Sequence, residues 1–183
     1  MIINKDQEIL KLIQLPQTRE AGYRLLLQVF QQQLYWQIRK LVINHDDAHD
    51  VLQNVFVKVF KGIHNFKGDS KLSSWLYRIA YNESMTFLNK KARQIQINDD
   101  DLQSYLVEQL QADVYFTGDE IQLALQKALA QLPKRQSEIF KMRYYDEVKF
   151  KDIAELLELS EGAVKSSYHI AAKKIELFLK RYE

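Results

Sequence analysis

The sequence predicts an all-α protein made of two small helical domains joined by an acidic linker. Apolar residues recur at the 3-4 spacing of amphipathic helices through most of the chain. Only five Gly and two Pro occur in 183 residues, which is few for strands joined by tight turns. Net charge also changes along the chain, from +6 over residues 1–97 to −7 over residues 98–120 and +3 over residues 121–183. Two basic blocks around an acidic one indicate two modules that face polyanions, with a solvated connector between them.

The first domain is expected to span residues 1–94 and to be built from three amphipathic helices. Apolar stripes predict these helices near residues 19–43, 46–61 and 70–92. Asp46 and Asp47 stand where a cap and first-turn acids would satisfy free amides and the helix dipole. The three stripes could be buried together in one core.

Helical periodicity fails over residues 95–118, which are expected to form the linker, with one short helix near 102–110. The second domain is expected to span residues 119–183. Its apolar spacing predicts four short helices, near 119–131, 135–145, 149–157 and 161–180. Pro133 separates the first two and fits its preferred place near a helix start.

The strongest local signal, over residues 150–165, is that of a helix-turn-helix. Ala154 is small where a second helix must pass closely. Ser160 can cap the second helix, whose amides and positive dipole can then bind a phosphate. The small core between the two helices is predicted to contain Ile153, Leu157, Leu159 and Val164.

The second helix of this motif is predicted to have distinct inner and outer faces. Its inward residues are expected to be Val164, Tyr168, Ala171, Ile175 and Phe178. The outward residues, arranged to enter a major groove, are then Lys165, Ser166, His169, Ile170 and Lys173. Lys173 and Lys174 are expected mainly to add affinity for the phosphate backbone.

The sequence favours a non-enzymatic protein without a metal or cofactor. It contains no cysteine, which removes disulfides, thiolate zinc sites and cysteine nucleophiles. His45 with His49, at i and i+4, could suggest a metal-dependent phosphohydrolase, but a metal site needs further ligands with supporting contacts. No Gly-rich phosphate loop or Ser/His/Asp arrangement is evident, and neither is a signal peptide or a membrane span. The chain is therefore expected to be soluble and cytoplasmic.

Three segments of the chain match patterns of one family in that family's order. Residues 66–82, FKGDSKLSSWLYRIAYN, are similar to the F-x-G-x-S…W-L-Y-R-I-A-x-N pattern of sigma region two. Residues 50–60, DVLQNVFVKVF, are similar to a polymerase-binding helix, and residues 132–166 are similar to sigma region four. Together they resemble the extracytoplasmic-function family of bacterial RNA polymerase sigma factors, in the sigma-70 superfamily.

The resemblance implies a sigma factor that binds core RNA polymerase and directs promoter recognition and opening. Region two of such proteins captures unpaired −10 bases with the loop before the Trp-bearing helix, here residues 63–74. A flipped base needs stacking and edge contacts that compensate for its lost pairing. The −10 contacts implied by the resemblance are Phe66, Lys67, Ser70, Lys71, Arg78, Asn82 and Thr86.

The resemblance also implies a polymerase surface and a second DNA surface. The polymerase contacts would be Asp50, Gln53, Asn54 and Lys58. The −35 contacts would be Ser160, Lys165, Ser166, His169, Ile170, Lys173 and Lys174. Family members are often held inactive by an anti-sigma factor, which is expected as a partner besides core polymerase and promoter DNA. The alternative is a stand-alone dimeric helix-turn-helix repressor, which would need a dimerisation helix and a ligand pocket.

The chain departs from the family's pattern at a few positions. The family commonly has an acidic residue where Asn54 stands and Arg where Ser167 and Ile170 stand. It commonly has Gly at Glu158, where a left-handed backbone would be costly for Glu. Without a guanidinium at Ile170, a bidentate guanine contact is lost there. Reading of the −35 element is therefore expected to differ from that of relatives, or to be weaker.

Overall fold

The computed structural model of this chain describes residues 5–110 and 120–180. All regular secondary structure in these two ranges is helical, which confirms the predicted all-α class. Contacts divide the chain into two compact units, Met1–Leu88 and Asn89–Glu183. This division falls inside helix α4 (Leu72–Gln94), whereas the sequence analysis ended the first domain at residue 94. No helix of the described ranges is long and apolar enough to cross a membrane.

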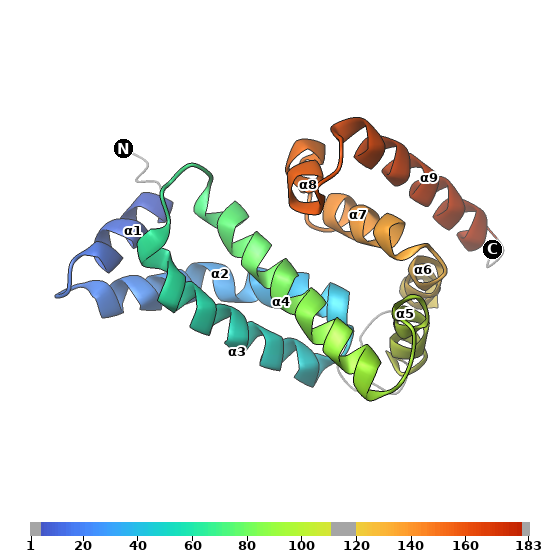
Figure 1. The fold of residues 1–183 in the computed structure, drawn as a ribbon, viewed down its shortest axis with the longest axis horizontal. Coiled ribbons are helices and arrows are strands. Elements are labelled where there is room, and N and C mark those ends of the chain that lie inside the picture. Colours follow the sequence, from blue (N-terminus) through green and yellow to red (C-terminus); the bar gives the residue numbers. More distant parts are fainter. Residues whose placement is uncertain (1–4, 111–119, 181–183) are drawn as a thin grey trace. The chain divides into compact units, whose positions relative to one another are not determined.

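The first unit contains α1 to α3 and most of α4 (Figure 1). Helix α2 (Arg19–Val42), helix α3 (His45–Gly62) and α4 lie within two residues of their predicted bounds. A short 3-10 helix, η1 (Ile63–Asn65), follows α3 and leads into the loop before α4. Helix α1 (Lys5–Gln14) was not predicted, because its apolar signal is short.

Apolar stripes of α2, α3 and α4 form the core of the first unit. Its fully buried side chains include Leu26, Ile38, Val55, Val59 and Leu76. Each such side chain contributes roughly 1.5–3 kcal/mol through removal from water. A polar contact supports this packing, since the buried Gln37 amide donates a hydrogen bond of 3.1 Å to the Tyr77 carbonyl on α4.

The cap of α3 is Asn44, which the sequence analysis did not name. Its side chain accepts a 3.0 Å hydrogen bond from the Asp47 amide. Asp46 and Asp47 therefore act only as first-turn acids, where the positive end of the helix dipole favours them.

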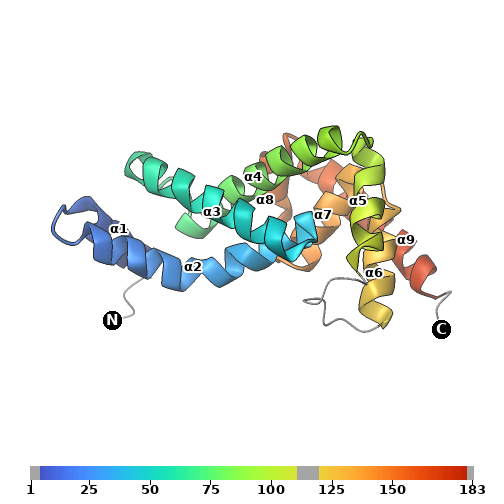
Figure 2. The ribbon, with the colours of Figure 1, turned by 90° about the horizontal axis from the view of Figure 1, so that it is seen from below.

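Helix α1 folds back along α2 and is held there by close backbone contact (Figure 2). The Thr18 hydroxyl donates a 2.8 Å hydrogen bond to the Leu12 carbonyl. The Arg19 side chain donates one of 3.3 Å to the Ile13 carbonyl. At the crossing stands Gly22, where an added Cβ would lie 2.6 Å from Ile13 Cγ1 and 2.8 Å from the Ile13 amide nitrogen. Only glycine allows this approach of the two helices.

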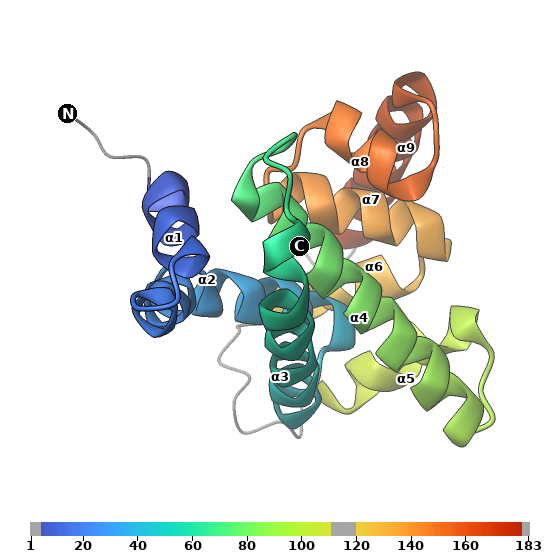
Figure 3. The same cartoon turned by 60° about the vertical axis from the view of Figure 1, so that its left-hand side comes forward.

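The second unit contains α6 (Glu120–Ala130), α7 (Lys134–Tyr144), α8 (Phe150–Leu157) and α9 (Glu161–Leu179). These four helices confirm the predictions for this region to within one residue at each end. Figure 3 shows α7, α8 and α9 grouped together. A core cluster of this unit brings together Ala128, Leu129 and Leu132 from the end of α6 and just after it, Phe140 of α7, and Ala171 and Ile175 of α9.

The segment expected to be a linker contains helix α5 (Asp99–Glu108), three residues earlier than the helix predicted near 102–110. Leu102, Leu106 and Leu110, spaced one turn apart, are buried, and α5 packs against α6. This part of the segment is thus folded into the second unit rather than solvated. Residues 111–118 of the expected linker lie outside the described residues.

Candidate nucleic-acid interfaces

Helices α8 and α9 form a helix-turn-helix joined by residues 158–160. Ile153, Leu157 and Val164 are buried between the helices, and the small Ala154 is buried beside them, as predicted. The prediction of Leu159 as the fourth core residue is wrong, because its side chain is 37% exposed. It lies in the turn, where the helical spacing on which the prediction rested no longer applies.

Glu158 adopts the left-handed conformation that the turn requires, with φ 55° and ψ 45°. The Leu159 amide donates a 2.9 Å hydrogen bond to the Ala154 carbonyl, which closes the helix end as in a Schellman motif. A left-handed residue other than Gly costs roughly 1–2 kcal/mol. The helix-turn-helix therefore forms without the glycine that is common in the family, with some backbone strain at Glu158.

The outer face of α9 carries the residues that the sequence analysis assigned to the major groove. Ser160 caps the helix, and its hydroxyl oxygen accepts a 3.2 Å hydrogen bond from the Ala163 amide. Exposed along this face are Lys165, Ser166, His169, Ile170, Lys173 and Lys174. Lys165 forms an ion pair of 2.6 Å with Glu161, and Lys174 donates to the Gln136 side chain on α7 at 3.2 Å. These contacts hold the two ammonium groups near the helix surface.

A second polar surface lies on α4 and the loop before it, in the first unit. Arg78, Asn82 and Thr86 are exposed on successive turns of α4. The Thr86 hydroxyl donates a 2.9 Å hydrogen bond to the Asn82 carbonyl. The loop contributes three further exposed residues, Lys67, Ser70 and Lys71. Side chains of the predicted base-capture set thus share one helix and the loop that leads into it.

Phe66 combines a packing role with partial exposure. Its ring lies 5.4 Å from the ring of Trp75, at an angle of 52°, and both side chains are half-buried. Trp75 also covers Gly62 at the end of α3, where an added Cβ would lie 3.6 Å from the indole. Trp75 therefore serves the core and supports Phe66, whose own ring stays partly open to solvent.

A third surface lies on the outer face of α3. Asp50, Gln53, Asn54 and Lys58 are all exposed on it. Lys58 pairs with Glu83 of α4, so its ammonium group is already engaged. The sequence analysis missed Val57, which is 50% exposed in the middle of this face. The sequence did contain a signal for this exposure. Val57 is apolar, but it does not share the helical spacing of the buried residues Val51, Val55 and Val59.

Family comparisons match both units. Residues 26–94 match the model of sigma-70 region 2, and residues 122–175 match the model of sigma-70 region 4. The two matches together cover about two thirds of the chain. This chain belongs to the sigma-70 family. It therefore directs transcription initiation, and the curated proteins that are similar to it include extracytoplasmic-function sigma factors.

Three curated proteins that are similar to this sigma factor cover most of its length. The RNA polymerase sigma-H factor of Pseudomonas aeruginosa is 26% identical over 94% of this chain and 92% of its own length. The ECF RNA polymerase sigma-E factor of Haemophilus influenzae is 26% identical over 93% of each chain. The ECF sigma factor SigW of Bacillus subtilis is 25% identical over 79% of this chain and 81% of its own.

Two solved structures have a similar fold. CnrH, determined in complex with the cytosolic domain of CnrY, is 19% identical, with a TM-score of 0.69 over 98% of this chain and all of the other. The sigma factor RpoE, in complex with the anti-sigma factor NepR from Bartonella quintana, is 21% identical, with a TM-score of 0.65 over 86% and 96%. All −10 and polymerase residues predicted for this sigma factor lie inside the region 2 match, and all −35 residues lie inside the region 4 match.

The histidine pair of this sigma factor is part of an aromatic cluster at the start of α3. The Tyr35 hydroxyl lies 2.8 Å from His45 Nδ1, and the rings of His45 and His49 are 4.6 Å apart. Among the described residues, no group of three or more His, Asp or Glu side chains could hold a metal ion. The i, i+4 pair is accounted for by these ring contacts.

One titratable residue, Lys141 on α7, was missed by the sequence analysis. Its side chain is 4% exposed, and its ammonium group donates a 3.0 Å hydrogen bond to the Gln103 side chain on α5. Burial lowers the pKa of Lys141 to about 8, although the nearby Glu138 carboxylate acts in the opposite direction. In the sequence Lys141 looked like one more basic surface residue, because nothing local marks a lysine that α5 contacts.

Proposed function

We propose that this sigma factor binds core RNA polymerase through α3 and reads two promoter elements with its two units. In this proposal residues 1–94 bind polymerase and the −10 element, residues 95–118 connect, and residues 119–183 bind the −35 element. The −10 contacts come from the loop and α4, and the −35 contacts come from α9. The protein would act in the cytoplasm, where RNA polymerase and the chromosome meet.

One observation supports this proposal over a stand-alone dimeric repressor. The chain presents a polar, partly aromatic surface around Phe66 and Asn82 in a unit separate from the helix-turn-helix. A dimeric repressor reads duplex DNA with its recognition helices and has no need of such a surface. A protein that opens DNA needs stacking and edge contacts for unpaired bases. The separate surface therefore favours promoter opening.

The test of the proposed function is whether sequence-specific DNA binding requires core polymerase. Selection from a random DNA pool, with and without added core enzyme, should give one promoter motif only when the enzyme is present. The Gln53→Ala, Asn54→Ala double variant should bind core polymerase more weakly and keep its helix content. Gln131→Ala, at an exposed position of the second unit, is the control and should bind core normally. A dimer that protects a specific duplex without polymerase would contradict the proposal.

Loss of the base-capture side chains should affect promoter opening more than binding to closed duplex. Phe66→Ala removes a stacking face, which is worth roughly 1–3 kcal/mol per base. The lower end of this range is expected, because Phe66 packs partly on Trp75. Asn82→Ala removes an edge contact. Permanganate footprinting should show fewer reactive thymines in both variants, whereas Gln28→Ala, on the exposed side of α2, should behave as wild type. Undiminished opening in both variants would remove the base-capture assignment.

Lys165 and Lys174 should have different effects on the −35 interaction. Lys165→Ala should change which −35 sequences are selected. The difference in binding free energy between sequences should change by about 1 kcal/mol, because the ion pair with Glu161 must open before Lys165 can contact a base. Lys174→Ala should leave the selected motif unchanged and lower the salt slope of binding by about one. The apolar side chain of Ile170 is 48% exposed, so it can contact the methyl group of thymine but cannot form a hydrogen bond with guanine. An identical −35 motif for wild type and Lys165→Ala would overturn the base-contact role.

We also propose that an anti-sigma factor controls this protein. Support comes from the structural likeness to RpoE, which was determined with the anti-sigma factor NepR. The α3 face offers a suitable docking surface, because Val57 places apolar area among polar side chains there. An inhibitor bound at this face would exclude core polymerase directly.

A further inference from the structure

We propose that α5 is a latch, which is docked on α6 and α7 in the free sigma factor and is released when the protein reads both promoter elements. The inference rests on the proposed reading of a −10 and a −35 element by the two units, and it assigns a role to the helix inside the connecting segment. Helix α5 lies outside both family matches, which end at residue 94 and begin at residue 122. Its contacts in this chain therefore have to show what it does.

While α5 is docked, a very short piece of chain joins α4 to the second unit. Helix α4 ends at Gln94 and α5 begins at Asp99, so only residues 95–98 lie between them. A segment of this length spans at most ~17 Å. The part of α4 from Asn82 to its end adds ~18 Å, at ~1.5 Å per residue. A unit of about 85 residues is ~30 Å across. Even in a straight line, the two reading surfaces would be at most ~65 Å apart.

A promoter requires a longer reach than this. Elements centred at −10 and −35 are about 25 base pairs apart, or ~85 Å at ~3.4 Å per base pair. Release of α5 lengthens the connector to residues 95–119, because α6 begins at Glu120. A chain of this length spans up to ~85 Å when it is extended. The released connector can therefore join the two reading surfaces on one promoter, whereas the docked one cannot.

Apolar contacts hold the latch closed. Leu102, Leu106 and Val107 are at most 4% exposed, and α5 packs against α6 (Figures 1 and 2). The helix has only ten residues, and an isolated helix of this length is marginal in water. We therefore expect α5 to lose its helical structure when it leaves α6. The chain entropy gained in this way lowers the free-energy cost of release.

Polar groups on α7 limit how tightly the latch closes. The Lys141 ammonium group is buried and contacts α5 through a 3.0 Å hydrogen bond to the Gln103 side chain. Burial lowers the pKa of this lysine to about 8, because the docked form penalises its charge. One turn earlier, the buried Ser137 hydroxyl has no hydrogen-bond partner in the described part of the chain. Release of α5 uncovers the ammonium group on the side of Gln103, which offsets part of the apolar contact that is lost.

The first experiment measures the distance between α5 and the end of α6 with paired spin labels. The chain contains no cysteine, so Ser104→Cys, on the exposed side of α5, and Gln131→Cys, just after α6, can be labelled selectively. The free sigma factor should give a narrow distribution of distances. In the complex with core polymerase and a promoter that has both elements, this distribution should shift to longer distances. The pair Gln131→Cys and Leu177→Cys, which leaves α5 out, is the control and should not shift.

Two substitutions should change promoter affinity and protein stability in opposite directions. Lys141→Met removes the buried charge and strengthens the closed latch, so the holoenzyme should bind the promoter about tenfold more weakly although the free protein is more stable. Leu102→Ala removes an apolar contact of α5, so the free protein should be less stable and the promoter should be bound more tightly. Ser104→Ala, at an exposed position of the same helix, is the control for both. If α5 only stabilised the fold, promoter affinity would follow stability in both variants, which would contradict the latch.

The outcomes separate the latch from the proposed function. Labels on residues 104 and 131 that do not shift, in a complex whose promoter has both elements, would overturn the latch and leave promoter reading intact. Unwinding at the end of α4 would then have to lengthen the connector instead. Selected DNA without a −35 motif would overturn the reading of two elements, irrespective of the distance that the labels report.

Discussion

Replacing Lys141 by Met is expected to raise the free energy of unfolding at pH 7 by about 2–3 kcal/mol. The pKa of Lys141 is lowered from 10.5 to about 8, mainly because burial penalises the ammonium ion. A difference of this size corresponds to about 3 kcal/mol of destabilisation when the lysine is charged in both states. Methionine has a similar length and no charge, so it removes that penalty. The hydrogen bond to Gln103 is lost as well, and this reduces the gain by about 1 kcal/mol or less.

The same residue predicts how stability changes with pH. Below pH 8 the lysine is protonated in the folded and unfolded states, and the folded state carries the full desolvation cost. Between pH 8 and 10.5 the unfolded chain binds more protons than the folded one, so stability rises with pH. Burial raises the pKa of Tyr145 to about 12, so stability falls above the phenol's usual value of 10.0. The rise is therefore to be measured from pH 7.5 to 9.5.

Urea unfolding followed by far-UV circular dichroism measures this effect. Wild type should gain stability across the window, and Lys141→Met should start higher and show no rise of this origin. Lys151→Met, at an exposed position of α8, is the control and should keep the wild-type pH profile. Both tryptophans, Trp36 and Trp75, lie in Met1–Leu88. A change in unfolding that is seen by circular dichroism but not by tryptophan fluorescence therefore belongs to the other unit. An equal rise in wild type and Lys141→Met would contradict the assignment to this side chain.

Gly22→Ala is expected to destabilise the first unit by about 1–2 kcal/mol. The added methyl would lie 2.6 Å from Ile13 Cγ1 and 2.8 Å from a backbone nitrogen, so α1 has to move away from α2. Overpacking of this kind typically costs about 1–3 kcal/mol. Alanine's better helix propensity returns up to about 1 kcal/mol of this. A net loss of stability remains because the added methyl group clashes with a backbone atom of α1, which cannot rotate away as a flexible side chain can.

Tryptophan fluorescence during urea unfolding reports this loss in the first unit. Gly62→Ala is the matched control, since its methyl would meet only the Trp75 ring, at an ordinary 3.6 Å. That variant should be as stable as wild type or slightly more so. Unchanged stability in Gly22→Ala would show that α1 is not held against α2 as closely as the structure indicates.

Most of the helices and the order of the two units could be predicted from the sequence alone. Apolar spacing predicted seven helices within two residues of their observed bounds, because burying one stripe of each helix dominates its stability. Local chemistry also predicted the Ser160 cap and the exposed side chains of α9, since both depend on neighbours within one turn. The family resemblance rests on the same local patterns, and the region 2 and region 4 matches confirm it.

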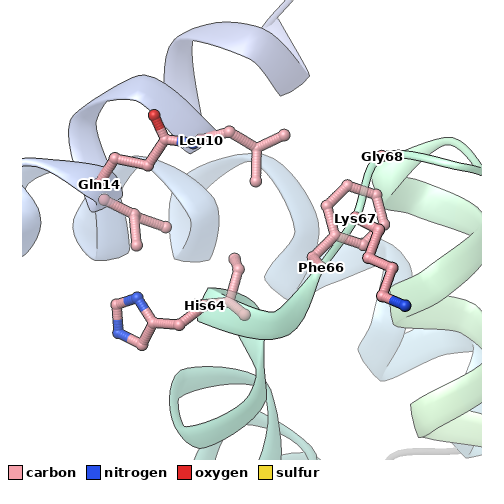
Figure 4. Close-up of a pocket in the computed structure, with 8 residues that line it drawn as sticks. Leu10, Gln14, His64, Phe66, Lys67 and Gly68 are labelled. Atoms are coloured by element: carbon pink, nitrogen blue, oxygen red, sulfur yellow. The ribbon is translucent and has the colours of Figure 1, made fainter.

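Which surfaces are covered, and what lies beside them, could be seen only in the folded chain. Helical spacing shows that Lys141 and Val57 occupy particular faces of α7 and α3, but burial of the lysine and exposure of the valine depend on distant segments. The docking of α1 rests on one glycine. A pocket lined by α1 and by the segment after α3 joins residues about fifty positions apart (Figure 4), which no local pattern records. A sequence pattern fixes which residues share a helix face, because that needs only the helical repeat. What packs against the face is set by contacts between segments far apart along the chain.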